Sequence, residues 1–217
     1  MLSLALVFGF GILAYRSTRI RETELSEVSQ RISDRLSKLW DIAHQGMREN
    51  RFLRAEKALL TILKIDQKNA AAYNRLGILY AKQKEYKDAI DCFEIASSIE
   101  PSASSLHNLG LIYYETENYE KAGLAFEQAI KLEDTLATRH IAYAKVQEKL
   151  GNDKMMLIEL EKAVELEPNP ETLGLLIRAY ESKERFSEAD LIKAKLNKLI
   201  MPAGKPRRVL RPRKVVV

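Results

Sequence analysis

A set of small, aliphatic and aromatic residues recurs along this chain at a constant interval. The clearest copy, AAAYNRLGILYAKQKEYKDAIDCFEIASSIEP, contains Tyr73, Leu76, Gly77, Tyr80, Ala89, Phe93 and Ala96. The same positions one period later hold Leu106, Leu109, Gly110, Tyr113, Ala122, Phe126 and Ala129. Self-similarity at a fixed period of about 20–50 residues is typical of repeat architectures, so this feature restricts the fold more than any other.

Each repeat position has a physical role in a pair of antiparallel helices. Small residues at Gly77 and Ala89 allow the two helices to approach closely, and large residues such as Tyr80 and Phe93 fill the space around them. Pro101 ends the second helix, because proline lacks an N–H donor and clashes with the preceding turn. No run alternates strictly between polar and apolar residues, so we predict an all-α fold.

Weaker copies of the pattern extend the repeat in both directions, and Asp134 stands where the third copy should end in proline. The pattern resembles the tetratricopeptide repeat family, most closely in the second and third copies. This resemblance implies a right-handed superhelical solenoid of about five helical hairpins within residues 36–203. We place the units near residues 36–69, 70–102, 103–136, 137–169 and 170–203.

The resemblance also implies where a ligand binds. In the family, the first helix of each hairpin lines a concave groove, and the groove-facing positions can be counted from the start of each unit. This count predicts a peptide-binding groove lined by Asn74, Ile78, Lys82, His107, Leu111, Tyr114, Ile141, Lys145 and Arg178. We expect an extended or helical protein segment to lie there, with its apolar side chains in pockets.

Alternative roles for these groove residues stay open at this point. Ile78, Leu111 and Ile141 can instead complete the packing between repeats, and Lys145 and Arg178 can either hold an acidic partner or lie on a solvated helix face. Family members that grip the acidic carboxyl terminus of heat-shock chaperones use a Lys/Asn/Arg constellation across three repeats. The chain lacks that constellation, so we do not expect this ligand.

The segment Met1–Tyr15, MLSLALVFGFGILAY, carries no charged side chain and is followed by Arg16, Arg19 and Arg21. It predicts a hydrophobic anchor helix over residues 1–16, and the positive-inside rule then places the repeats in the cytoplasm. Two alternatives are a cleaved secretory signal and a soluble helix packed on the domain. A signal carries its positive charge before the apolar run, so we expect a single-pass membrane protein.

Residues 17–35 predict an amphipathic linker helix between the anchor and the repeats. One apolar stripe continues from it at Leu25, Val28, Ile32, Leu36 and Leu39. The stripe can pair with a second copy as a short coiled coil, which makes a homo-oligomer compatible with the sequence, or it can pack on the first repeat.

Residues 204–217 predict a basic disordered tail, because they contain two prolines and show no helical period. Its cations are Lys205, Arg207, Arg208, Arg211, Arg213 and Lys214, with no acidic residue among them. They can attract anionic lipid, an acidic protein or RNA, or simply keep the chain soluble. The tail lacks aromatic side chains for base stacking, and the basic balance lies outside the body, so nucleic acid is not an expected partner.

Residue patterns for catalysis are missing from the sequence. His44, His107 and His140 lack metal-binding spacing, and no glycine-rich phosphate loop or G-x-S-x-G motif occurs. The single cysteine, Cys92, falls in a helical apolar stripe and is expected in the core. We therefore expect no enzyme activity, no cofactor and no metal site.

Together these features predict a non-enzymatic scaffold or adaptor, anchored at a membrane, that binds a peptide or protein segment in its groove. The alternative is a nucleic-acid- or ribosome-associated factor that uses the basic tail. Removing residues 205–217 distinguishes the two, because only the second then loses its partner, with a steep salt dependence.

Overall fold

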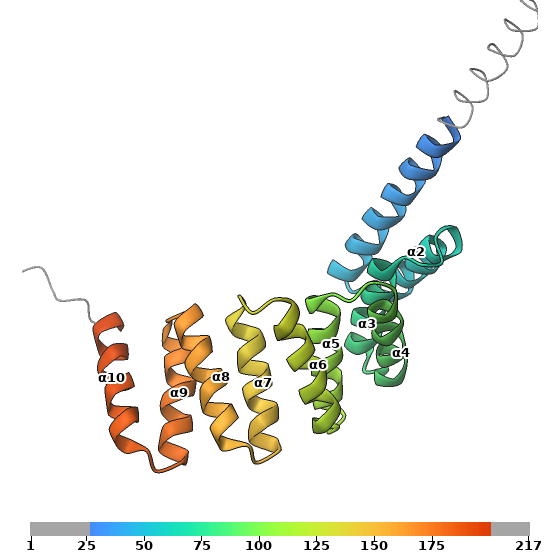
Figure 1. Ribbon diagram of the computed structural model, residues 1–217. Coiled ribbons are helices and arrows are strands. Elements are labelled where there is room, and N and C mark those ends of the chain that lie inside the picture. The colour runs from blue at the N-terminus through green and yellow to red at the C-terminus, as the bar shows by residue number, and fades with distance from the viewer. Residues whose placement is uncertain (1–26, 201–217) are drawn as a thin grey trace, which may run out of the picture. The chain divides into compact units, whose positions relative to one another are not determined.

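The computed structural model describes residues 27–200, which lie in helices and in the short connections between them (Figure 1). No strand occurs among these residues, which confirms the predicted all-α fold. The chain divides into two compact units between Glu100 and Pro101. We call residues 27–100 the N-terminal unit and residues 101–200 the C-terminal unit. The predicted right-handed superhelix depends on how the units are placed relative to one another, so its handedness stays a prediction.

The helices are short and of nearly constant length. In the N-terminal unit, a helix over residues 27–48 is followed by α2 (Phe52–Ile65), α3 (Ala70–Gln83) and α4 (Tyr86–Ile99). The C-terminal unit contains α5 (Ala103–Glu115), α6 (Tyr119–Leu132), α7 (Ala137–Lys149), α8 (Asp153–Leu166), α9 (Pro170–Ser182) and α10 (Phe186–Ile200). Within the C-terminal unit each helix packs against the next one in the chain, and Figure 1 shows α7 to α10 standing in a row.

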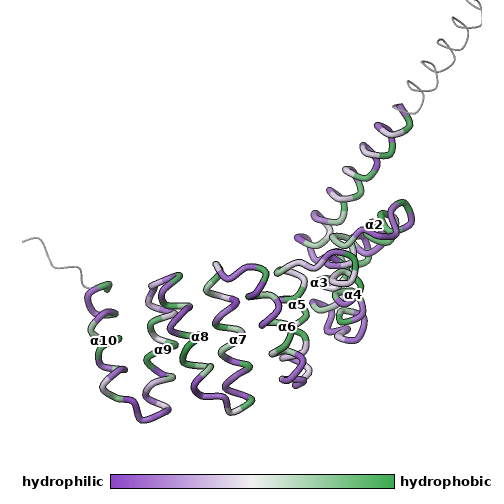
Figure 2. The backbone as a smooth tube through the Cα atoms, in the orientation of Figure 1, coloured by the Kyte–Doolittle hydropathy of each residue, from purple (hydrophilic) through white to green (hydrophobic). Residues whose placement is uncertain are grey.

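Apolar residues recur along each helix, as the green segments of Figure 2 show. In the N-terminal unit, Leu59 of α2 and Leu76 of α3 belong to one buried cluster. In the C-terminal unit, Leu160 of α8, Leu176 of α9 and Ala189 of α10 belong to another. Each hairpin therefore completes its core against a neighbouring hairpin, as expected for a repeat protein.

The glycines of the pattern lie where an aromatic ring leaves no room for a side chain. A Cβ atom on Gly77 would lie 2.7 Å from the ring of Phe93, and one on Gly110 would lie 2.9 Å from the ring of Phe126. Both rings are almost fully buried, so they cannot move aside cheaply. The close approach that the sequence assigned to Gly77 and Ala89 is therefore chiefly a contact between Gly77 and Phe93.

Two tyrosines of the pattern also join consecutive hairpins by hydrogen bonds. The Tyr80 hydroxyl on α3 donates to Glu56 on α2 at 2.9 Å, and the Tyr180 hydroxyl on α9 donates to Glu161 on α8 at 2.5 Å. Burial, followed by the bonded carboxylate, raises the pKa of both hydroxyls, that of Tyr180 to about 12. Both therefore stay protonated donors, a role beyond the space filling that the sequence predicted.

Every hairpin turn between residues 27 and 200 passes through one residue in the left-handed region. These residues, one in each repeat, are Asn50, Lys84, Glu117, Gly151 and Glu184. The next amide then donates to a carbonyl one helical turn back, as from Glu85 to Tyr80 at 2.9 Å, which is a Schellman closure. Among these residues, Gly151 alone has no side chain opposing this conformation.

The connection between α6 and α7 lacks the proline that Pro101 and Pro168 supply in the connections before α5 and α9. Arg139, only 2% exposed, closes it instead: its guanidinium donates to the Glu133 carbonyl and, at 3.1 Å, to the Glu133 carboxylate. The Nε2 atom of His140 lies 2.9 Å from the Asp134 carbonyl oxygen, and its Nδ1 atom lies 2.7 Å from the Glu159 carboxylate on α8. These two buried side chains therefore hold the connection to the hairpin that follows.

The predicted single-pass membrane localisation has to be corrected. Within residues 27–200, no helix is both long and apolar enough to cross a membrane. α2 and α10, with 14 and 15 residues, span about 21–23 Å against roughly 30 Å of bilayer hydrocarbon. The helix over residues 27–48 is longer but carries charges on several faces, including Arg31, Asp34 and Arg35. The segment predicted as the anchor, residues 1–16, lies outside the described residues.

The predicted apolar stripe of the linker meets two environments. Leu36 and Leu39 pack against the buried cluster of the N-terminal unit. Val28 and Ile32 are 53% and 45% exposed, and Leu25 lies outside the described residues. The stripe from Leu36 onward therefore packs on the first repeat, and a coiled coil through Val28 and Ile32 stays a prediction.

Candidate functional site

The first helices of the C-terminal hairpins, α5, α7 and α9, line two adjacent hollows. The first has a volume of about 300 Å³ and is lined mainly by α5 and α7, with Leu111, Tyr114 and Ile141 as its large apolar side chains. The second has a volume of about 310 Å³ and lies between α7 and α9, with Met156 and Leu160 of α8 at its base. Ile141 and Lys145 belong to both linings, so the hollows form one continuous surface, which we call the groove.

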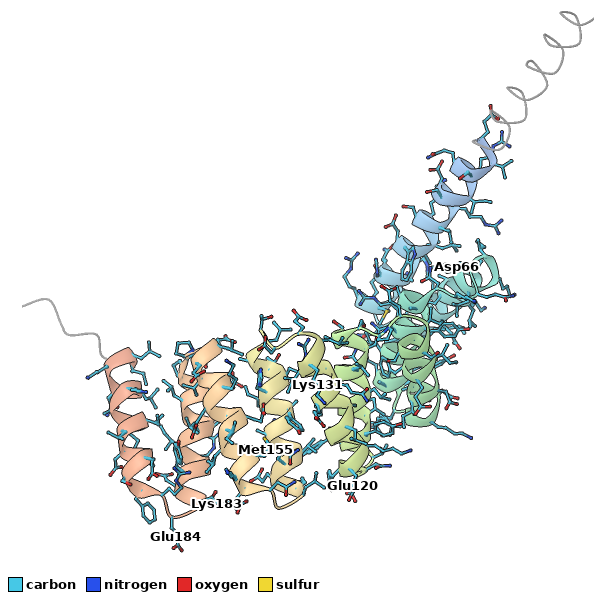
Figure 3. All side chains as sticks on the ribbon, viewed as in Figure 1. Asp66, Glu120, Lys131, Met155, Lys183 and Glu184 are labelled. Carbon is cyan, nitrogen blue, oxygen red and sulfur yellow. The ribbon has the colours of Figure 1, made fainter. Side chains whose placement is uncertain are left out.

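Charged groups of both signs border the groove. Lys145 and Arg178 supply cations, whereas Glu115, Glu148 and Glu171 supply carboxylates. Neither cation has an ion-pair partner among residues 27–200. Lys183, labelled at the turn between α9 and α10 in Figure 3, behaves differently, because it pairs with Asp153 at 2.6 Å. The groove cations therefore remain available to a ligand.

His107 stands at the α5 end of the groove as a neutral polar group. Its ring meets the Phe126 ring edge to face, with 5.4 Å between the centroids, and its buried Nδ1 atom has no hydrogen-bond partner among residues 27–200. Burial lowers the pKa of His107, and the nearby positive charge of Arg139 lowers it further. The imidazole therefore presents no positive charge to this part of the groove at neutral pH.

Tyr114 is held in place at the rim of the first hollow. Its ring packs edge to face on Tyr119 of α6, with 5.5 Å between the centroids. Because a fixed aromatic ring loses little conformational entropy when a ligand binds, Tyr114 is a suitable anchor for an apolar side chain.

A further hollow, of about 410 Å³, lies in the N-terminal unit. Ile78 and Lys82 of α3 line it as predicted groove residues, together with His44, Met47, Arg48 and Arg75. Asn74 is partly buried on α3 and lines none of these three hollows. Sequence reasoning missed His44, Met47 and Arg48 because it assigned no groove positions to the degenerate first unit, although the same count would have found them.

The six tail cations from Lys205 to Lys214 lie outside the described residues, so the role predicted for them stays a prediction. Within residues 27–200, no group of three or more histidine, cysteine, aspartate or glutamate side chains is placed to hold a metal ion. Cys92 is buried, and burial, followed by Asp88 and Asp91, raises the pKa of its thiol to about 11. At neutral pH this thiol is therefore protonated.

Comparison with known proteins agrees with this geometry. Family models described as tetratricopeptide repeat match residues 68–132 and 137–170. The chain carries tetratricopeptide repeats. These two matches include the second and third copies, which resemble the family most closely in sequence. No curated protein sequence matches the chain.

Solved structures of tetratricopeptide-repeat proteins share the fold. The MamA protein superposes with a TM-score of 0.70 at 22% identity, covering 83% of this chain and 100% of MamA. MamA from residue 41 to its end, from Desulfovibrio magneticus RS-1, has a TM-score of 0.68 at 16% identity, covering 79% and 98%. YrrB, described as a TPR protein with an unusual peptide-binding site, has a TM-score of 0.62 at 21% identity, covering 75% and 84%. At these identities the likeness establishes the fold.

Proposed function

We propose that this chain is a non-enzymatic interaction scaffold whose C-terminal unit binds a peptide segment of another protein. The observation that carries the proposal is the lining shared by the two hollows, because Ile141 and Lys145 make the surface continuous from α5 to α9. A groove that runs across three successive hairpins suits an extended or helical segment better than a compact small molecule.

The chemistry of the groove supports a segment with both apolar and polar side chains. Leu111, Tyr114 and Ile141 offer apolar contact at one end, and Lys145 and Arg178 offer donors at the other. The description of YrrB as a peptide-binding TPR protein supports this reading by analogy of fold. The placement of the proposed binding site in the groove rests on the residues of this chain.

Leu111 provides the most direct test, because it lines the groove while being 39% exposed. Peptides would be selected from a random display library on the full-length protein, and the affinity of an enriched peptide would then be measured for Leu111→Glu. We expect a loss of about tenfold or more, since a carboxylate replaces an apolar contact at the end of the groove where Leu111, Tyr114 and Ile141 gather. The matched control is Leu124→Glu, at a 59% exposed leucine on α6 that does not line the groove.

The control variant should keep the affinity of the wild-type protein within about twofold, which is less than about 0.5 kcal/mol. Thermal unfolding of both variants checks that neither substitution disturbs the fold. Equal losses for Leu111→Glu and Leu124→Glu, or a library that yields no enriched peptide, would contradict a peptide site in the groove.

A further inference from the structure

The hollow beside α3 in the N-terminal unit differs in charge from the groove of the C-terminal unit. It lies between the helix over residues 27–48 and α3, and it has a volume of about 410 Å³. Arg48, Arg75 and Lys82 line it with three permanent positive charges, and His44 adds an imidazole. No carboxylate of residues 27–200 is part of the lining. We call it the cationic hollow.

The three cations are not neutralised from within the described chain. None of Arg48, Arg75 and Lys82 has an ion-pair partner among residues 27–200. Glu49, next to Arg48 in the sequence, is already engaged by Arg51 at 3.2 Å and by Gln45 at 2.8 Å. Like charges that line one hollow raise the local positive potential, which favours an anionic ligand and speeds its association.

The cationic hollow also has an apolar part. Met47, which is 8% exposed, and the partly buried Ile78 contribute its aliphatic surface. A methionine side chain is flexible and adapts to the shape of a bound aliphatic group. The described part of the chain contributes no phenylalanine, tyrosine or tryptophan to the lining, so it supplies no stacking platform of the kind that single-stranded nucleic acids use.

We propose that the cationic hollow is a docking site for an acidic segment of a partner protein, with an aliphatic side chain between its carboxylates. The carboxylates pair with Arg48, Arg75 and Lys82, and arginine offers them two parallel donors. The aliphatic side chain lies on Met47 and Ile78. The tail of the chain itself is excluded as the occupant, because residues 205–217 carry six cations and no acidic side chain.

This site is independent of the groove in the C-terminal unit, and an experiment on the full-length protein separates the two. The probes are a short fluorescent peptide of aspartate and glutamate with one central leucine, the same peptide with glycine for leucine, and a lysine-rich counterpart. The test variant is Arg48→Gln with Lys82→Gln. The charge-matched control is Arg35→Gln with Lys64→Gln, because both of these side chains are exposed and neither lines the cationic hollow.

We expect the acidic leucine peptide to bind the wild-type protein and to lose about tenfold or more in affinity to the Arg48→Gln, Lys82→Gln protein. The Arg35→Gln, Lys64→Gln protein should stay within about twofold, although its net charge is the same. The glycine peptide should bind more weakly than the leucine peptide, and the lysine-rich peptide should not bind. Leu111→Glu should leave this binding unchanged, which distinguishes a failure here from a failure of the groove.

Three results would overturn the proposal. Equal losses in both double variants would mean that only the overall charge matters. Equal affinity for the glycine and leucine peptides, with full displacement by inorganic phosphate, would reduce the hollow to a small-anion site. Tight binding of a single-stranded RNA, lost in the Arg48→Gln, Lys82→Gln protein, with no binding of the acidic peptide, would assign the hollow to nucleic acid.

Discussion

The two compact units share one repeat pattern but differ in charge. Residues 27–100 contain 13 lysines and arginines against 11 aspartates and glutamates, whereas residues 101–200 contain 13 against 17. The difference reaches the ligand-facing surfaces, because Lys82 lines the cationic hollow and Glu115, one period later, lines the groove. Outward positions are free of packing constraints, so equivalent positions of one scaffold can carry charges of opposite sign.

The connections between successive hairpins also differ from one another. In the N-terminal unit, Asn69 caps α3 by accepting from the Ala72 amide at 2.9 Å, and its own amide donates to Asp66 at 2.9 Å. In the C-terminal unit, Asn169 caps α9 in the same way, accepting from the Thr172 amide at 2.9 Å. Between α6 and α7, the buried Arg139 stands at the position equivalent to Ala72, and the cap residue of α7 makes no side-chain bond. A local asparagine cap therefore suffices at these two connections, and a long buried side chain closes the α6–α7 connection, which lacks one.

The largest expected effect tests this second difference. Arg139→Ala should lower the free energy of unfolding by about 2–4 kcal/mol, because it removes buried volume and leaves the Glu133 carbonyl without its donor. Arg139→Met keeps most of the volume and should lower the free energy of unfolding by about 1–2 kcal/mol, which measures the contribution of the hydrogen bonds. Urea unfolding followed by circular dichroism measures both values.

Hydrogen exchange locates the effect of Arg139→Ala within the chain. Protection should fall in α6 and α7 and change least in α3 and α4, because the lost contacts belong to the C-terminal unit. If Arg139→Ala lowered the free energy of unfolding by less than about 1 kcal/mol, or if protection fell equally in both units, Arg139 would not be the residue that holds this connection.

A pair of glycine substitutions gives the next largest effect. Gly77→Ala in the N-terminal unit should lower the free energy of unfolding by about 1–3 kcal/mol, because the added methyl group would overlap the buried Phe93 ring. Gly174→Ala in the C-terminal unit should instead raise the free energy of unfolding by about 0.5–1 kcal/mol, because the added Cβ would meet only the Arg178 side chain, at 3.7 Å. Trp40, the one tryptophan of the chain, reports on the N-terminal unit by fluorescence during denaturation. Effects of the same sign at both glycines would contradict the assigned contacts.

The smallest expected effect is a pH dependence confined to the C-terminal unit. The pKa of His107 is lowered in the folded protein, whereas a histidine side chain in the unfolded chain has a pKa of about 6.5. The unfolded chain therefore binds more protons below that pH, so the stability contribution of neutral His107 is complete above about pH 6.5 and is lost as the pH falls. His107→Leu should flatten the slope of unfolding free energy between about pH 7 and 5.

His44→Leu in the N-terminal unit is the matched control for loss of one imidazole. Proton NMR on the Arg139→Met protein adds a second readout, because removing that positive charge should raise the pKa of His107. Parallel pH profiles for the wild-type and His107→Leu proteins would show that His107 does not titrate differently in the folded state.

Counting along the repeat anticipated much of the groove lining. Ile141, Lys145 and Arg178 line it at the positions expected from the helical period, because side chains one period apart present the same face. The same count stopped before the first unit, so Arg48 was missed. Arg139 and His140 could not be found in this way, because their partners depend on the path of the connection between α6 and α7.

The sequence by itself determined that this chain forms helical hairpins with a regular period, because helix propensity, turn spacing and apolar periodicity are local properties. Only the tertiary structure decided which charges stand together. Arg48 and Lys82 lie one repeat period apart in sequence and come from different helices, yet they line one hollow because neighbouring hairpins stack in register. Distances across such a stack are set by contacts between neighbouring hairpins, such as the Tyr80 hydroxyl with the Glu56 carboxylate, whose partners belong to different repeats.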